Sequence, residues 1–305
     1  MRQVLIVHYS QTGQLDRLAQ SVCGPLQQHA DIQLDYLQLQ PAQPYPFPWP
    51  FLDFFRIFPE TVLMRPQPLL PLAVDASKRY DLVILAYQVW FLSPSQPMTA
   101  FLASPEAAQL LKGTPVVTLI GCRNMWLMAQ EKLKARLTEL GARLVDNIAL
   151  TDACGTAASF LATPLWLFTG RQKPYSWVPR AGIDEAEIVA ASRFGQAMAQ
   201  RLTADSLPIE QPMLSGLGAV RIDEKLIASE KVGNRSFQLW SRLLAALGPQ
   251  QSRRRAVGLV VYIVFLLCLI VTVVPLSALL KKLLAPLLKE RTQREKAYFA
   301  GPSGE

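Results

Sequence analysis

The chain has 305 residues, enough to form one large domain or two small ones. Half of the residues are hydrophobic, 18% are charged and the mean hydropathy is +0.19, so part of the chain is more apolar than a soluble protein requires. The net charge of +8 does not form a basic stripe interleaved with aromatic residues, and we therefore expect no nucleic-acid partner. The 4 cysteines lack the paired spacing of metal ligands, which argues against a zinc site and a disulfide framework.

The first predicted element is a strand at residues 4–7, an apolar run typical of a strand buried on both faces of a parallel sheet. A burst of polar residues and a helical pattern up to Val22 follow it. The burst consists of Ser10, Gln11, Thr12, Gly13 and Gln14. It joins the carboxyl end of a strand to the amino end of a helix, where free amides and the helix dipole favour an anion. A phosphate site and an ordinary capped turn both fit these residues.

Four more strands are predicted in the first half of the chain. They lie at residues 32–39, 81–87, 115–121 and 142–150. Helical patterns alternate with them at residues 97–103, 125–140 and 184–202. Because strands and helices alternate, we expect an α/β fold with a parallel, doubly wound sheet.

Two apolar segments interrupt this plan. Residues 40–72, the first insert, combine many prolines with many aromatic residues, which excludes an ordinary long helix at its start and is unusual for a solvated loop. Residues 157–177, the second insert, contain a run of about ten apolar residues, too short to span a membrane. We expect the two inserts to lie side by side near lipid, as an apolar lid or a foot at the membrane interface. The alternative is that they pack together as an extra core.

The C-terminal region contains the most apolar segment. Residues 256–280 carry no charge over 25 positions, long enough to cross the roughly 30 Å hydrocarbon core of a bilayer, and we interpret them as one transmembrane helix. Basic residues on both flanks suit anionic lipid head groups. They are Arg253, Arg254, Arg255, Lys281, Lys282, Lys289, Arg291, Arg294 and Lys296. The leucine-rich stretch at 276–288 also fits a hairpin or a helix that lies in the interface.

The predicted organisation has three parts. A globular domain occupies residues 1–204, a helical linker residues 205–252 and a membrane anchor residues 253–305. Because the first strand does not resemble a signal peptide, we expect the globular domain to face the cytoplasm from the cytoplasmic membrane.

Three predicted loops should meet at one edge of the sheet. In doubly wound sheets, ligands bind outside the carboxyl ends of the strands, where the strand order reverses. Residues 10–14 offer hydroxyls and amides, whereas residues 87–95 and 121–126 offer aromatic rings. This combination describes a mononucleotide with a planar ring. The glycine motif of NAD-binding folds and the Walker A motif are both absent.

Two stretches resemble a known family. YSQTG at residues 9–13 resembles the phosphate loop of flavodoxins and flavodoxin-like quinone and FMN reductases, and ILAYQVWFLSPSQPMTAFLAS at 84–104 resembles their second loop. The resemblance covers residues 2–150 and implies a five-stranded sheet in the order 2-1-3-4-5 with one bound FMN. The cofactor-binding residues that it implies are Ser10, Gln11, Thr12, Gly13, Gln14, Tyr87, Gln88, Val89, Trp90, Phe91, Gly121, Cys122 and Trp126. The chain departs from the family in having Leu15 where flavodoxins often carry a hydroxyl, and in being basic.

Other segments carry a narrower resemblance. GCRNMWLMAQEKLK at 121–134, EKVGNRSFQLW at 230–240 and the apolar tail resemble the flavodoxin-like condensing enzymes of bacterial dialkylresorcinol biosynthesis. That family implies conversion of a dialkyl cyclohexanedione, made by a partner ketosynthase, into the aromatic resorcinol, with the flavin as hydride acceptor. A hydrophobic or lipid substrate would account for the apolar segments.

Three residues are candidates for catalysis. Arg123 and Asn124 follow the fourth strand and are placed to polarise a carbonyl or bind an enolate; the alternative is a solvated arginine and a helix-capping asparagine. His8 precedes the phosphate loop, where a structural role is the more common one. Two other functions fit the sequence: a membrane-tethered quinone reductase or electron carrier, and a flavin-free scaffold of a biosynthetic complex. A homodimer is compatible with each.

Overall fold

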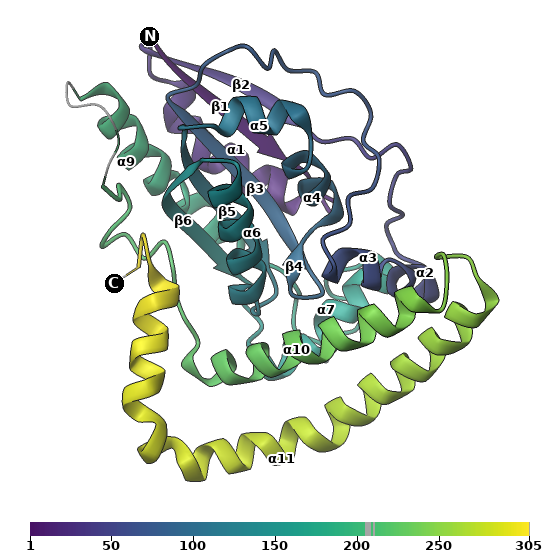
Figure 1. The fold of residues 1–305 in the computed structure, drawn as a ribbon. Coiled ribbons are helices and arrows are strands. Elements are labelled where there is room, and N and C mark those ends of the chain that lie inside the picture. Colours follow the sequence, from purple (N-terminus) through teal and green to yellow (C-terminus); the bar gives the residue numbers. More distant parts are fainter. Residues whose placement is uncertain (205–208, 210, 305) are drawn as a thin grey trace.

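The computed structural model describes residues 1–204, 209 and 211–304. Within them, five parallel strands form the central sheet (Figure 1). These are β1 (Arg2–His8), β2 (Ile32–Gln38), β3 (Leu82–Trp90), β5 (Pro115–Cys122) and β6 (Arg143–Thr151), in the order β2-β1-β3-β5-β6. The predicted parallel, doubly wound sheet is confirmed. The order differs from the prediction only by the short strand β4 (Ser93–Pro94), which pairs antiparallel with β3.

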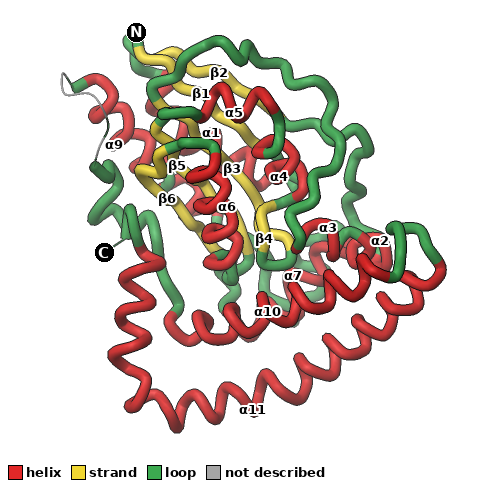
Figure 2. Tube along the Cα trace, viewed as in Figure 1, coloured by secondary structure: helices red, strands yellow, loops and turns green. Residues whose placement is uncertain are grey.

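Helices cover both faces of the sheet (Figure 2). On one face lie α1 (Gln14–Gln27), α8 (Glu185–Ala190) and α9 (Ser192–Thr203). On the other lie α4 (Gln96–Leu102), α5 (Pro105–Leu111) and α6 (Leu127–Glu139). Because side chains alternate along a strand, Leu82 and Ile84 of β3 belong to the first core, whereas Val83 and Leu85 belong to the second.

The two inserts lie side by side, as predicted. The first contains α2 (Phe51–Arg56) and α3 (Phe58–Val62), and the second contains most of α7 (Thr156–Thr169). The backbone N–H of Trp49 donates to the carbonyl of Leu167 at 2.9 Å, and the ring centroids of Phe51 and Phe168 are 5.2 Å apart. The inserts thus pack against each other through aromatic side chains. Their contact with lipid stays a prediction.

The region after α9 is helical only in part. Residues 211–223 run beside β6, where the N–H of Ala149 donates to the carbonyl of Ala219 at 2.8 Å. The linker becomes helical at α10 (Glu224–Ala246), whereas residues 205–208 and 210 lie outside the described part of the chain. The helical linker predicted at 205–252 is therefore wrong for residues 211–223, which form turns and one isolated bridge to β6, between Ala149 and Val220. The predicted domain boundaries otherwise stay predictions.

The last helix, α11 (Arg253–Ala300), has 48 residues and bends beneath the α/β domain (Figure 1). Its first part, Arg253–Thr272, is long and apolar enough to cross a membrane by length and composition. The transmembrane role that the sequence suggests stays a prediction.

Arg255 corrects one expectation about the basic flank of α11. Its guanidinium pairs with the carboxylate of Glu60 in α3 and also donates to the carbonyl of Arg56 at 3.2 Å. Both members of the pair are buried. Because its guanidinium is buried in this ion pair, Arg255 is not available to lipid head groups. The pair fixes the beginning of α11 to the first insert.

Candidate functional site

A cavity of about 1330 Å³ lies at the carboxyl ends of β3, β5 and β6. The loop between β1 and α1 lines one end of it. At the other end it reaches α7, α10 and α11, where apolar side chains line it together with polar ones such as Glu224, Lys225 and Lys289. The residues there include Leu226, Phe237, Leu266, Leu269 and Ile270. Small-molecule sites usually measure about 300–1,000 Å³, so this cavity has room for more than one ligand.

The three loops predicted to meet do line this cavity together. The N–H of Gln11 lies 3.4 Å from the side-chain oxygen of Gln88, which links the loop after β1 to β3. The predicted residues that line the cavity are Gln11, Thr12, Gln14, Gln88, Val89, Trp90, Phe91, Gly121, Cys122, Arg123 and Asn124. Their roles toward a ligand stay predictions.

The loop after β1 presents a helix N-terminus to the cavity. Gly13 precedes α1 in the left-handed conformation, with φ of 76°. Because glycine has no side chain, it cannot cap the N–H groups of the first turn of α1. The hydroxyl of Thr12 lies 3.4 Å from the N–H of Gln14. The hydroxyl of Ser10 is buried and has no partner among the described residues. A buried hydroxyl without a partner costs about 1–3 kcal/mol, which a bound polar ligand would recover.

The side chain of Gln14 has a different role from the predicted one. Its amide donates to the carbonyl of Ile183 at 3.2 Å and accepts from the N–H of the same residue at 3.1 Å. Gly182 lies against it with φ of 103°, and a Cβ there would come within 2.7 Å of the Gln14 amide nitrogen. The side chain thus fixes the loop before α8, and Gln14 has only its backbone to offer a phosphate.

The turn between β3 and β4 is strained. Phe91 and Leu92 both have positive φ, 50° and 56°, although both carry bulky side chains. Packing holds the turn, because the ring of Phe91 lies 4.5 Å from that of Phe54 and 5.1 Å from that of Phe58. Phe91 and Leu92 line the cavity at this turn. Such strain is concentrated at functional sites.

Trp90 forms a wall of the cavity and is held by the first insert. Its ring centroid lies 5.1 Å from that of Tyr45 and 6.0 Å from those of Tyr9 and Trp49, each in an edge-on arrangement. These contacts hold the indole in one orientation. The first insert therefore helps to build the site.

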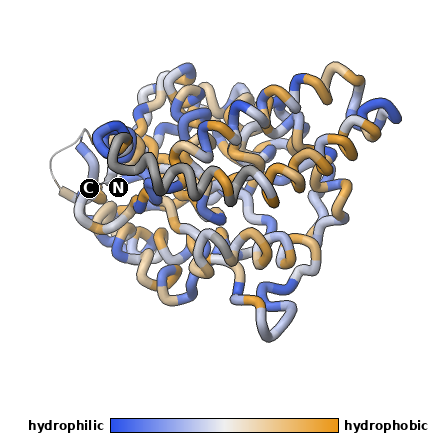
Figure 3. The backbone as a smooth tube through the Cα atoms, turned by 90° about the horizontal axis from the view of Figure 1, so that it is seen from below, coloured by the Kyte–Doolittle hydropathy of each residue, from blue (hydrophilic) through white to orange (hydrophobic). Residues whose placement is uncertain are grey.

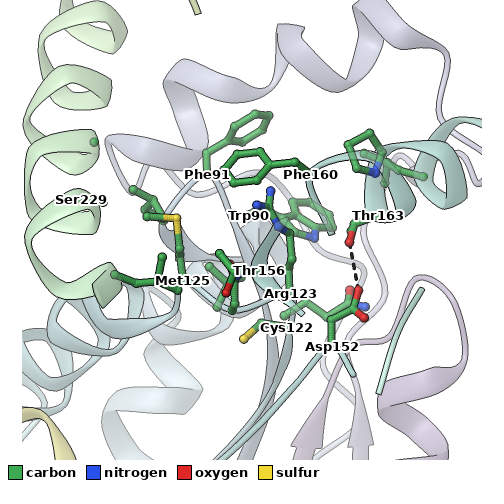
Figure 4. Close-up of a pocket in the computed structure, with 18 of the residues that line it drawn as sticks. Trp90, Phe91, Cys122, Arg123, Met125, Asp152, Thr156, Phe160, Thr163 and Ser229 are labelled. Carbon is green, nitrogen blue, oxygen red and sulfur yellow. Dashed lines mark hydrogen bonds between the residues drawn. The ribbon is translucent and has the colours of Figure 1, made fainter. Parts of the chain in front are cut away.

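Arg123 projects into the cavity from the end of β5 (Figure 4). Its Nε donates to the hydroxyl of Ser159 at 2.9 Å, and its guanidinium carbon lies 4.0 Å from the ring centroid of Phe160. Its Nη2 is buried without a partner among the described residues. Burial lowers the pKa of Arg123, and the negative charge of Asp152 opposes this shift. The alternative of a solvated arginine does not hold.

Asp152 is a site residue that the sequence reasoning missed. It follows β6 and lines the cavity, where its carboxylate accepts from the hydroxyl of Thr163 at 3.0 Å and from the N–H of Cys154 at 3.0 Å (Figure 4). Its position just after the carboxyl end of a strand was the available signal.

Asn124 lines the cavity, and its side-chain oxygen is buried without a partner among the described residues. It does not cap α6. That role belongs in part to Glu230 of α10, whose carboxylate accepts from the N–H of Met128 at 2.7 Å. Burial raises the pKa of Glu230 to about 8, although the α6 amides favour its charged form. Glu230 thus ties α10 to the first turn of α6, a role that no local pattern indicated.

Five of the predicted site residues are not among those that line the cavity. Ser10 and Gly13 belong to the loop beside it, and the other three lie away from it. Tyr87 faces the core beneath α6, where its hydroxyl donates to the side-chain oxygen of Gln130 at 2.7 Å. Trp126 is buried in the same core. His8 lies 2.9 Å from the carboxylate of Asp16, measured from its Nδ1. The prediction of ring contacts for Tyr87 fails because β3 continues to Trp90, so that strand alternation turns Tyr87 inward.

Burial also decides the state of Cys122. It raises the pKa of the Cys122 thiol, and the negative charges of Glu230 and Asp152 raise it further. The thiol is therefore protonated at neutral pH and acts as a small apolar group in the cavity wall.

No protein-family model and no curated protein sequence matches the chain. Among solved structures, a flavodoxin from the domain Archaea shares 8% identity over 67% of this chain and 100% of its own, with a TM-score of 0.38. A flavoprotein from Lactobacillus acidophilus in complex with FMN shares 14% over 48% and 92%, with a TM-score of 0.37. The Trp repressor binding protein from Bacillus subtilis shares 14% over 63% and 99%, with a TM-score of 0.30. Similarity this low does not establish a shared ligand or activity.

Proposed function

We propose that the chain binds FMN in this cavity and acts as an oxidoreductase on a hydrophobic substrate. The observation that carries the proposal is the continuity of the cavity, which joins an uncapped helix N-terminus to the apolar surfaces of α10 and α11. An anion-binding end and an apolar end in one space fit a phosphorylated cofactor beside an apolar molecule.

The residues of the loops fit FMN in residue type. The N-terminus of α1, Thr12 and the unpartnered hydroxyl of Ser10 would hold the phosphate. Trp90 and the backbone from Gly121 to Asn124 would surround the ring. When bound, FMN supplies hydride transfer, whereas the protein supplies binding and orientation.

Arg123 and Asn124 would bind the polar head of the substrate. Each has a buried polar atom without a partner among the described residues, Nη2 of Arg123 and Oδ1 of Asn124. A guanidinium in a site shielded from water stabilises negative charge on a substrate oxygen, such as that of an enolate. The apolar side chains of α10 and α11 would hold the remainder of the substrate.

The narrower proposal concerns the reaction. We infer that the substrate is a dialkyl cyclohexanedione, delivered by a partner ketosynthase, and that its ring loses two hydrogens to become a dialkylresorcinol. Two segments that resemble the condensing enzymes, 121–134 and 230–240, contact each other through Met128 and Glu230, which supports this proposal. Arg123 would stabilise the enolate oxygen, while the ring would lose one hydrogen as a proton to water and the other as a hydride, for which bound FMN would be the acceptor.

The apolar end of the cavity also favours a second candidate. A lipid-soluble quinone is planar, carries two carbonyls and has an apolar chain, so the same residues would receive it. In that case the protein reduces quinone with electrons from a nicotinamide donor and needs no ketosynthase.

The first test is an absorption spectrum of the full chain purified in mild detergent, with identification of any released chromophore. We expect stoichiometric FMN, or its uptake on titration. Turnover of cyclohexanedione or of quinone then separates the two candidate reactions. A colourless protein that does not take up FMN would refute the proposal and favour the scaffold.

A further inference from the structure

Both ends of α11 are held by the same domain. At its beginning, Arg255 forms the buried ion pair with Glu60 described above. Near its end, Lys296 pairs with Glu224 at 2.9 Å, and the hydroxyl of Tyr298 donates to Glu131 at 2.7 Å. These contacts connect the last turns of α11 to α10 and α6.

The residues after α11 dock onto the sheet itself. The hydroxyl of Ser303 donates to the carboxylate of Asp146 at 2.6 Å and accepts from the N–H of Asn147. All three residues are buried. The chain therefore returns from α11 to the α/β domain (Figure 1).

A single membrane crossing is incompatible with these contacts. A helix over residues 256–280 would be about 37 Å long and would place its two ends on opposite sides of a bilayer. Arg255 and Ser303 both contact the same α/β domain and its inserts. Both ends of α11 must therefore lie on one side of any membrane that it enters.

The first part of α11 has two apolar faces with different surroundings. Leu259, Tyr262 and Ile263 are buried against α3 and α10, and Tyr262 stacks on Phe58 at 4.4 Å. The opposite face is exposed, and we call it the α11 face. It consists of Val257, Val260, Val261, Val264, Leu267 and Val271. Figure 3 shows apolar residues along this side of the molecule, where α10 and α11 lie. Continuous apolar surfaces of this kind are uncommon on soluble monomers and indicate an interaction site.

Charge at the two ends of α11 indicates what covers this face. Arg253 and Arg254 are exposed before it. After it, Lys289, Arg291 and Arg294 are exposed, of which Arg291 pairs with Glu295 at 3.1 Å and Arg294 with Glu290 at 3.5 Å. Basic residues beside an apolar helix suit the anionic head groups and acyl chains of a lipid surface.

We propose that α11 lies in the plane of a membrane, with the α11 face embedded in one leaflet and both ends of the helix on the same side. The cavity gives this arrangement a function. Leu266, Leu269 and Ile270 line the cavity and alternate along the helix with residues of the α11 face. The embedded helix thus forms a wall between the lipid and the cavity, and a lipid-soluble molecule reaches the cavity beside it. The proposal does not depend on FMN.

Vesicle flotation tests the surface. The full chain, with Val264→Asp and Val271→Asp, is compared with the wild type on vesicles of equal parts phosphatidylcholine and phosphatidylglycerol. These valines are 55% and 73% exposed, so the fold should tolerate the change. We expect binding to fall about tenfold or more, because two embedded valines are lost. Val189→Asp is the control, since Val189 is 70% exposed on α8, away from α11.

Labelling with a membrane-impermeant maleimide tests the topology. Gln251 and Gln293 are exposed on the two sides of the apolar segment, and each is replaced by cysteine in full chains that carry Cys268→Ser. We expect both cysteines to react from outside sealed vesicles to which the protein has been added.

Three outcomes would overturn the proposal. Protection of the cysteine at position 293 until detergent opens the vesicles would show a crossing helix. Unchanged flotation of the double aspartate variant would show that another surface binds lipid. A stable dimer that does not bind vesicles would show that a second copy covers the α11 face.

Discussion

The two ends of the cavity are built in different ways. The polar end is the short loop at residues 10–14, in which neighbouring positions supply the hydroxyls and the helix N-terminus. The apolar end is assembled from α7, α10 and α11, which lie far from that loop in the sequence. A local sequence motif can therefore indicate a cofactor. The class of substrate, in contrast, depends on helices that are far apart in the sequence and meet only in the folded chain.

The largest predicted effect concerns the attachment of the apolar end. Glu60→Ala leaves Arg255 buried without a counter-charge, so we expect the free energy of unfolding to fall by about 3–5 kcal/mol. Chemical denaturation in detergent measures it. Asp53→Ala is the control, because it breaks an exposed pair with Arg56 and should cost about 0.5 kcal/mol or less. Equal losses in the two variants would show that the buried pair does not hold α11.

The second prediction concerns Arg123, which lies between the two ends of the cavity. Arg123→Gln removes the guanidinium from the middle of the cavity, and we expect turnover of the hydrophobic substrate to fall by about 10²–10³-fold with FMN binding retained. Arg193→Gln is a matched control, because the Arg193 guanidinium carbon also lies over a phenylalanine ring, 4.1 Å from the centroid of Phe194, outside the cavity. Unchanged turnover in Arg123→Gln would show that the Arg123 guanidinium takes no part in the chemistry.

A third prediction concerns Glu230, which connects α10 to the first turn of α6. Burial raises the pKa of Glu230 from 4.5 to about 8, so the folded chain holds a proton that the unfolded chain releases at lower pH. Stability should therefore fall as pH rises between these values. We expect the free energy of unfolding to fall by about 1 kcal/mol per pH unit from roughly pH 6 to 8, relative to Glu230→Gln.

The exposed Glu139 at the end of α6 provides the control for this pH dependence. Glu139→Gln should keep the slope of the wild type. If Glu230→Gln and the wild type show the same change of unfolding free energy with pH, the carboxylate of Glu230 is charged in the folded state, and the prediction is wrong.

The smallest predicted effect concerns Ser10, in the loop at the polar end of the cavity. Ser10→Ala should weaken FMN binding about tenfold, or about 1.4 kcal/mol, as measured by fluorescence titration. Without FMN its stability should be unchanged or slightly higher, because a buried hydroxyl without a partner among the described residues is removed. Ser176→Ala, a change at an exposed serine outside the cavity, should alter neither quantity. Loss of apo stability in Ser10→Ala would indicate a structural hydroxyl.

The sheet and the meeting of three loops could be predicted because they depend on local patterns. Apolar runs marked the strands, and the carboxyl ends of parallel strands share one edge. Phe91 and Leu92 show where local patterns fail. Their turn has two positive φ values without the asparagine or glycine that usually marks such a turn, and packing from the first insert holds it.

The remaining parts of the site depend on long-range contacts. Glu230 caps α6 from 102 positions away, at Met128. Arg255 forms an ion pair with Glu60, 195 positions away in the sequence. One of the basic residues that we expected to face lipid head groups is therefore buried inside the protein. No periodicity or motif contains such a pairing, because its partners are brought together only by the complete fold.

The docking of the last residues on β6 has a consequence for self-association. β6 is an edge strand, and an unpaired edge offers its N–H and C=O groups to the strands of other molecules. Ala219 occupies the N–H of Ala149, and Ser303 occupies that of Asn147. The C-terminal residues therefore cover the edge of the sheet, and a chain truncated before Ser303 would expose part of that edge to edge-to-edge aggregation.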